Sequence, residues 1–258
     1  MIEKITITDP NDLIIYWWND VKTLKNKKIF TFKPGINIIV GKNASGKSTL
    51  LKLIARHFHC EQGGISYLTN PSIYEIFGFD EKKIYKGYEI THDGQPVGYH
   101  SPEKEIGIYS GTFDDDFMDD GIKSLLTRQV SQGQKTISNI SNITKKLSAT
   151  NEIKCSMNKN RVNDLWVKKI DNAYELLNRG KTLKPSQKTL LLDEPERSLD
   201  LENELGFFSI LEKIKDKYQI IIATHSPFAF FISDAHYIEI TRGYHNLIKK
   251  QIKEKING

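Results

Sequence analysis

The eight residues from Gly41 to Ser48 constrain this chain more than any other stretch. They match the pattern G-x-x-x-x-G-K-[ST] at every fixed position. Residues 36–40 before them are β-branched and nearly all apolar, as in a buried parallel strand, and apolar residues recur at helical spacing from Leu50 to Ile54. A strand, a glycine loop and a helix in this order aim backbone N–H groups and a helix N-terminus at one point. The sequence therefore predicts a phosphate-binding site.

Two side chains of this loop have a defined chemistry in the pattern. The Lys47 ammonium would reach the β- and γ-phosphates of a nucleotide, and the Ser48 hydroxyl would ligate Mg²⁺. The strand, the helix and the motifs described next argue against the alternative, which is a glycine turn before a basic helix.

Two further strands end in side chains that suit the same chemistry. Residues 189–194 form an apolar run that closes on Asp193 and Glu194. Because a buried strand can deliver a carboxylate to Mg²⁺ only at its C-terminal end, Asp193 is predicted to hold the metal. Glu194, one residue further on, is placed to accept a proton from water. Another β-branched run, 220–224, leads into His225, which is placed to sense a γ-phosphate through a hydrogen bond.

The composition fits a soluble globular protein with one sizeable core. Of 258 residues, 38% are hydrophobic and 27% charged, and no apolar run approaches the roughly 18 residues that span a bilayer. We therefore expect a cytoplasmic protein, with Cys60 and Cys155 as free thiols. The net charge of +5 is uneven, because residues 121–190 contain 14 Lys and Arg against 4 Asp and Glu. Such a basic region suits nucleic acid, and a solvated helical face explains it equally well.

We expect a single domain over residues 1–258, built from three parts. Residues 1–64 and 186–258 would form the nucleotide-binding core, 65–110 an antiparallel β part, and 111–185 a helical part. In the β part, His92-Asp93-Gly94 between two β runs predicts a hairpin. The acidic cluster at 114–120 matches no calcium-loop spacing, so we interpret it as a solvated loop.

Five segments, GKNASGKS, VSQGQK, LLLDEP, SLD and ATHSP, occur in the order found in ABC-type ATPases. The chain resembles that class over nearly its whole length. VSQGQK departs from the family's signature LSGGQ, with Val130 in place of Leu and Gln132 in place of the first Gly. Within the class, the chain looks more like soluble SMC/RecF-type and AAA-annotated ATP-binding proteins than transporter ATPases. The features that resemble the soluble proteins are the segments FKPGIN, DEPE and THSP and the spacing of more than fifty residues between SQGQK and LLLDEP.

This resemblance implies an α/β fold with a P-loop NTPase core, in which flanking helices cover a mostly parallel sheet. An antiparallel β subdomain and a helical signature-motif subdomain would complete it, with the signature at 131–134. The resemblance also implies an ATP sandwich of two head-to-tail copies. Glu194 and His225 would be catalytic, Ser48 and Asp193 would hold Mg²⁺, and Asp200 would communicate across the interface. The implied nucleotide-binding residues are Gly41, Lys42, Asn43, Ala44, Ser45, Gly46, Lys47, Ser48, Thr49, Ser131, Gly133, Gln134 and Asp200.

Two features of the family have no assigned residue in this sequence. One is a Gln that touches Mg²⁺ and the attacking water, for which Gln95 is a candidate although it falls in the expected hairpin turn. The other is an aromatic ring that stacks on adenine. Tyr16, Trp17 and Phe30 are candidates for it, and core packing is the alternative role of each.

The function implied by the resemblance is an ATPase that uses ATP and Mg²⁺ and forms a homodimer when ATP binds. It would control a separate effector protein or a nucleic acid, as in DNA maintenance and phage defence, with no membrane partner. One alternative is the ATPase subunit of a membrane transporter, which predicts a permease partner. Another is a P-loop kinase or GTPase, but those proteins lack SQGQK and the His at the strand end. No nuclease constellation is apparent.

Overall fold

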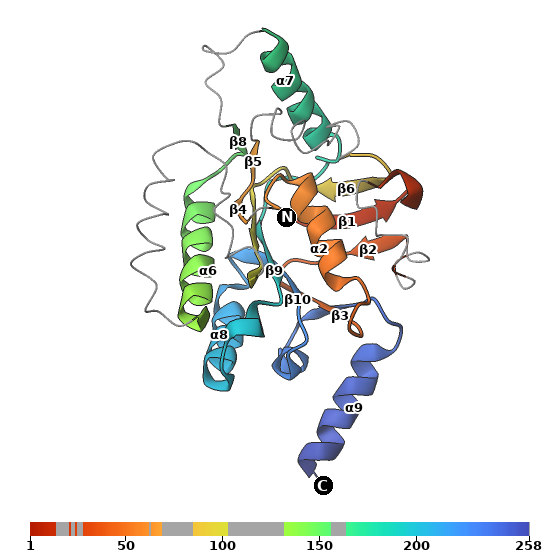
Figure 1. Ribbon diagram of the computed structural model, residues 1–258, viewed down its shortest axis with the longest axis vertical. Coiled ribbons are helices and arrows are strands. Elements are labelled where there is room, and N and C mark those ends of the chain that lie inside the picture. Colours follow the sequence, from red (N-terminus) through yellow and green to blue (C-terminus); the bar gives the residue numbers. More distant parts are fainter. Residues whose placement is uncertain are drawn as a thin grey trace.

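The computed structural model describes residues 1–13, 21, 24, 28–61, 63–68, 85–102, 132–155 and 164–257. Within them, strands and helices alternate along most of the chain and build the α/β fold that the sequence predicts (Figure 1). No helix in this part of the chain is long and apolar enough to cross a membrane.

A six-stranded sheet forms the centre of the molecule. Its strands lie in the order β11-β3-β10-β9-β7-β4, and every pair is parallel except β4 with β7. The prediction of a mostly parallel sheet is therefore confirmed. Because β10 lies between β3 and β9, the ends of these three strands meet at one edge of the sheet. The strands are β3 (Ile36–Val40), β4 (Gly64–Ile65), β7 (Val97–His100), β9 (Lys188–Asp193), β10 (Tyr218–Ala223) and β11 (His236–Glu239).

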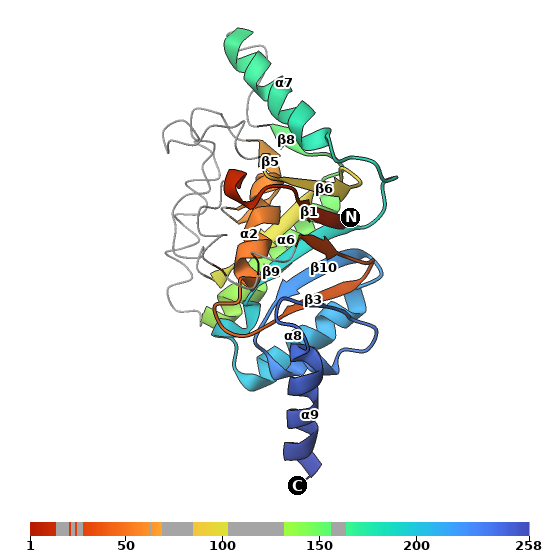
Figure 2. The ribbon, with the colours of Figure 1, turned by 90° about the vertical axis from the view of Figure 1, so that its right-hand side faces the viewer.

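Alternate residues of the central strands enter two different cores. In β10, Ile221 belongs to a core shared with helix α2 (Lys47–His57), whereas Ile220 and Ile222 belong to a core on the opposite face. Side chains of α6 (Gln132–Ala149), α8 (Leu201–Ile214) and α9 (Tyr244–Asn257) contribute to that second core. Figure 2 shows α2 and α8 on different sides of the sheet, while α9 extends away from the body and carries the C-terminus.

A smaller antiparallel sheet adjoins the first core. It consists of β2 (Ile29–Thr31), β1 (Ile2–Ile7) and β6 (Tyr88–His92), in that order. Gln219 of β10 ties the two sheets together, since its side chain accepts a hydrogen bond from the Ile2 amide at 2.8 Å and donates one to the Ile2 carbonyl at 2.6 Å. Strands β5 (Tyr67–Leu68) and β8 (Lys154–Cys155) form a separate parallel pair.

The hairpin predicted around His92-Asp93-Gly94 is wrong. Strand β6 pairs with β1, and β7 pairs in parallel with β9. All four residues of β7 are buried, as befits an interior strand of the large sheet rather than half of a surface hairpin. The Asp93 carboxylate instead anchors the chain before β9, because it accepts hydrogen bonds from the Ser186 amide and hydroxyl.

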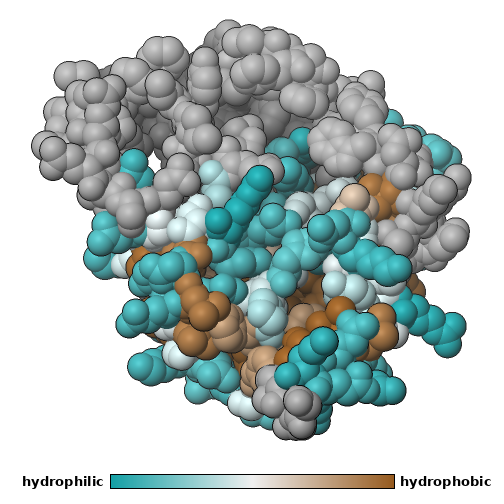
Figure 3. Space-filling view, turned by 60° about the horizontal axis from the view of Figure 1, so that its bottom comes forward, coloured by the Kyte–Doolittle hydropathy of each residue, from teal (hydrophilic) through white to brown (hydrophobic). Residues whose placement is uncertain are grey.

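The helical part contains α6 and α7 (Asp164–Asn178). Three short 3₁₀ helices connect the larger elements: η1 (Pro10–Asp12), η6 (Pro195–Ser198) and η7 (Pro227–Phe231). Large apolar side chains remain exposed on α8, η7 and α9, and Figure 3 shows apolar patches between hydrophilic side chains on the lower face.

Candidate active site

The phosphate-loop motif lies between β3 and the first turn of α2. The loop folds tightly because Gly46 adopts a left-handed φ of 96°, and a Cβ at this position would lie 2.4 Å from Leu24 Cδ1. Lys42, Asn43 and Ala44 form the exposed tip, whereas Ser45, Lys47 and Thr49 are buried and Ser48 is half-buried. The Lys47 ammonium folds back over the loop and donates to the carbonyl oxygens of Gly41 and Lys42, each at 3.3 Å.

The same ammonium contacts the end of β10. Lys47 Nζ lies 2.7 Å from His225 Nε2. Burial lowers the pKa of His225, and the neighbouring Lys47 charge lowers it further. Burial also lowers the pKa of Lys47, although the charge of Glu194 opposes this shift. A neutral imidazole whose Nε2 atom accepts a hydrogen bond from the ammonium accounts for the short distance.

Asp193 stands at the C-terminal end of β9 and is almost fully buried. Its Oδ2 atom accepts a hydrogen bond from the Tyr99 hydroxyl at 3.3 Å, whereas Oδ1 is shielded from solvent and has no hydrogen-bond partner among the described residues. Burial raises the pKa of Asp193, while the nearby Ser48 hydroxyl and the Lys52 charge oppose the rise.

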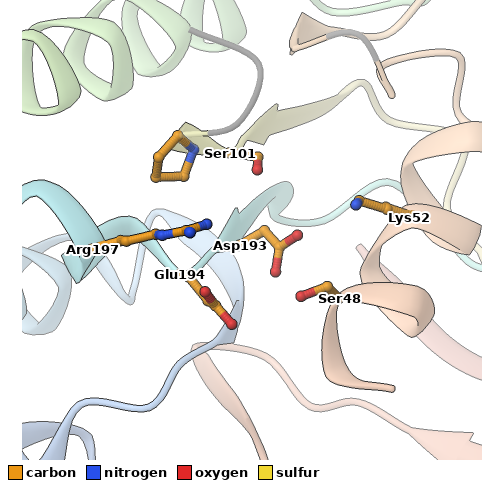
Figure 4. A pocket seen from close by; sticks show the side chains of 7 residues that line it. Ser48, Lys52, Ser101, Asp193, Glu194 and Arg197 are labelled. Atoms are coloured by element: carbon orange, nitrogen blue, oxygen red, sulfur yellow. The ribbon is translucent and has the colours of Figure 1, made fainter. Parts of the chain in front are cut away.

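A pocket of about 60 Å³ opens beside this carboxylate, large enough for several waters. Figure 4 shows Ser48, Asp193 and Glu194 pointing into it, with Lys52 and Arg197 approaching from either side. Ser101 and Pro102 complete the lining.

These residues fit Mg²⁺. The described residues contain no cluster of three His, Cys, Asp or Glu that could hold a metal. Mg²⁺, however, often uses one or two protein oxygens and fills its other positions with waters and phosphates. The Ser48 hydroxyl and the unpaired Asp193 oxygen in one pocket match that requirement.

Glu194 follows directly, in a conformation unusual for a residue with a side chain. Its φ of 46° and ψ of 50° are left-handed, and its amide donates to the Ala223 carbonyl at 2.8 Å. Such backbone strain persists where the surrounding structure enforces it. Here it turns the carboxylate toward the end of β10, so that Oε1 lies 3.6 Å from His225 Nε2.

Glu196 was not identified from the sequence. Its Oε1 atom accepts hydrogen bonds from the Thr224 hydroxyl at 2.7 Å and from the His225 amide at 2.8 Å. In the sequence, only the motif DEPE, whose last residue is Glu196, pointed to this position. No motif pattern assigns chemistry to it.

The signature segment lies elsewhere. Ser131 falls outside the described residues, and Gln134 is exposed. A Cβ on Gly133, in the first turn of α6, would lie 2.8 Å from the Ser198 carbonyl, so this turn packs against η6. Asp200 is exposed at the start of α8, where its Oδ1 accepts from the Asn203 amide at 2.9 Å. Within the described part of the signature, the structure therefore places Gly133 beside Ser198 of the SLD segment.

Other candidates from the sequence do not reach the pocket or fall outside the described residues. Gln95 precedes β7, at the end of that strand away from Asp193, because β7 runs parallel to β9. Ser101, which follows β7, occupies the pocket side instead. Phe30 is buried in the first core. Tyr16, Trp17 and the acidic cluster at 114–120 lie outside the described residues.

A phosphate loop, a strand-end acid pair and a strand-end His on one sheet edge define a P-loop nucleoside triphosphatase site. A family model described as ABC transporter matches residues 26–197, which is more than half of the chain. The chain belongs to this family, and the predicted resemblance to ABC-type ATPases is confirmed. Membership implies nucleotide binding and, in general, ATP hydrolysis.

Among solved structures, the chain is similar to MJ0796, a bacterial ABC transporter cassette solved as a dimer. The identity is 13% and the TM-score 0.34, with 93% of this chain and 95% of that chain covered. No curated protein sequence matches this chain.

Proposed function

We propose that this chain is a Mg²⁺-dependent ATPase that converts ATP and water to ADP and phosphate. The observation that carries the proposal is the convergence of Lys47, Glu194 and His225, with 2.7 Å between Lys47 and His225 and 3.6 Å between Glu194 and His225. Groups that grip a γ-phosphate and activate water must lie this close together for in-line attack.

Each side chain has one role in the reaction. Lys47 leaves His225 and binds the β- and γ-phosphates, because a phosphate oxygen is a stronger partner for an ammonium than an imidazole is. Glu194 accepts a proton from the attacking water. His225, released from Lys47, orients that water and the γ-phosphate. Ser48 and Asp193 would hold Mg²⁺, which would neutralise charge on the phosphates.

We further propose that two copies close head to tail around ATP. Gly133 packs on Ser198, and the nearby Gln134 and Asp200 are exposed, so these two side chains are accessible to a second copy. The residues Ser131, Gly133 and Gln134 of one copy would then cap the nucleotide held by the other. To pass from almost all open to almost all closed, such a switch needs ATP to favour the closed dimer by roughly 5.5 kcal/mol.

Two variants test this function. Lys47→Ala should abolish binding of Mg-ATP, because it removes the cation that contacts the phosphates. Glu194→Gln should retain Mg-ATP, lose turnover and accumulate as a dimer, because the nucleotide stays intact. Size-exclusion chromatography with light scattering, with and without Mg-ATP, measures the outcome. A Glu194→Gln protein that binds ATP yet stays monomeric would remove the sandwich mechanism.

The effector is proposed to be a nucleic acid or a separate protein, in a process of the DNA-maintenance or phage-defence type in the cytoplasm. The basic region 121–190 supports the nucleic-acid choice, and its described part includes exposed Lys145, Lys146, Lys181 and Lys184. DNA should then bind at low salt and stimulate ATP turnover. If single- and double-stranded DNA do neither, a protein effector remains.

The family description favours a second candidate, the ATPase subunit of a membrane transporter. This function requires a surface that couples to a permease. Affinity purification of the tagged chain from solubilised membranes separates the two functions, since a transporter subunit should bring down a multi-spanning membrane protein in stoichiometric amount.

A further inference from the structure

Glu196 links the two loops that carry the reacting side chains. It lies in η6, two residues after Glu194, and its Oε1 atom bonds Thr224 and the His225 amide just beyond β10. One carboxylate oxygen thus ties the loop after β9 to the loop after β10.

The hydrogen-bond chain extends beyond these two residues. The Thr224 hydroxyl accepts from the Ser226 amide at 2.9 Å, and the Ser226 hydroxyl accepts from the Phe228 amide at 3.1 Å, where η7 begins. The backbone on both sides of His225 is therefore held. Since the amide of His225 is fixed by Glu196, the direction in which the imidazole leaves the backbone is fixed as well.

Burying the second oxygen of the Glu196 carboxylate is energetically unfavourable. Glu196 Oε2 is shielded from solvent and has no hydrogen-bond partner among the described residues. Burial raises the pKa of Glu196, and the hydrogen bonds from His225 and Thr224 oppose the rise. An unsatisfied buried oxygen in a folded protein calls for an explanation, and proximity to reacting groups is one.

We propose that Glu196 is a positioning residue for ATP hydrolysis, which holds His225 in register with Glu194 when Lys47 moves to the phosphates. The inference rests on the proposed function, because it needs His225 to act on the γ-phosphate and water. Gln at 196 keeps an acceptor oxygen for both hydrogen bonds, whereas Ala removes it.

The test compares Glu196→Ala, Glu196→Gln and the control Glu175→Ala, an exposed residue of α7. Glu196→Ala should lower kcat roughly 10- to 100-fold, with the Kd for Mg-ATP changed by less than about 3-fold, because misplacing a reacting group by about 1 Å has an effect of this size. Glu196→Gln should recover most of kcat, and Glu175→Ala should match the original chain. Wild-type turnover in Glu196→Ala, or equal losses in the Gln and Ala variants, would overturn the inference.

A second measurement needs no nucleotide. Hydrogen exchange of the His225 amide in the ATP-free protein should be slow in the original chain and in Glu196→Gln, and fast in Glu196→Ala. Unchanged exchange in Glu196→Ala also overturns the inference. If the original chain binds or hydrolyses no ATP, the proposed function fails, while the exchange rates still decide whether Glu196 holds His225.

Discussion

Gly180 lacks a side chain, and this allows the chain after α7 to pass close to β6. It follows α7, and its carbonyl accepts a hydrogen bond from the His92 amide at 3.0 Å as the chain passes β6. A Cβ on Gly180 would lie only 1.6 Å from the Ile90 carbonyl oxygen. By contrast, a Cβ on Gly206 in α8 would have, among the described residues, no atom within 4 Å apart from its chain neighbours and the backbone of its own helix.

These two glycines give a matched pair of substitutions. Gly180→Ala should destabilise the protein by several kcal/mol, on the scale of other severe backbone clashes, because α7 must move away from β6. Gly206→Ala should stabilise it by up to about 1 kcal/mol, since Ala favours the helix and has free space. Denaturant titration followed by circular dichroism measures both, and a tolerated Gly180→Ala would contradict the close approach.

Four histidines are buried near the ends of α2, β6 and β7. His57 lies 5.7 Å from His92, ring centre to ring centre, and its Nδ1 atom is 3.2 Å from the Tyr88 hydroxyl. Burial lowers the pKa of His57, and lowers the pKa of His59, His92 and His100 to about 4. These histidines are therefore neutral in the folded protein at neutral pH.

This burial predicts sensitivity to acid. The folded pKa values lie below the unfolded value of about 6.5, so the unfolded chain binds more protons between pH 6.5 and 4. The contribution of these histidines to stability is present above pH 6.5 and is lost as the pH falls toward 4. For His59, His92 and His100, whose pKa values fall to about 4, the loss is on the order of 2 kcal/mol each at pH 5.

The variant His59→Asn isolates one histidine, because Asn does not titrate and tolerates the φ of 53° found there. The free energy of unfolding at pH 7 and pH 5, measured by urea titration, should fall less between the two values in His59→Asn than in the original chain. Equal losses in the two proteins would mean that His59 titrates normally in the fold.

The proposed head-to-tail arrangement predicts how mixtures of whole chains should behave. In that arrangement, each site takes Lys47 and Glu194 from one copy and Ser131 from the other. Lys47→Ala mixed with Ser131→Arg should therefore regain about a quarter of the original turnover, because half of the dimers contain one intact site out of two.

A second mixture provides the control. Lys47→Ala with Glu194→Gln should stay inactive, since both changes affect the same half of a site and no heterodimer contains an intact one. Recovery in this control, or none in the first mixture, would exclude the head-to-tail site. The measurement is phosphate release at equal total protein.

The sequence alone determined the parts of the site that depend on the order of neighbouring residues along the chain. Lys47 and Ser48 follow a strand and a glycine loop, and Asp193 and Glu194 close an apolar strand, so their backbone positions follow from the chain itself. Parallel strand ends share one edge, which explains why separate motifs were expected to meet there.

Only the tertiary structure decided which strands are neighbours and which polar groups meet across them. The local Asp-Gly pattern predicted a hairpin. Strand β7 is instead buried on both faces and lies beside β9 in the large sheet, so Ser101 rather than Gln95 lines the pocket. The hydrogen bonds of Glu196 to Thr224 and His225 join residues 28 and 29 positions apart. Contacts of this kind arise from packing between distant segments, and local sequence patterns do not encode them.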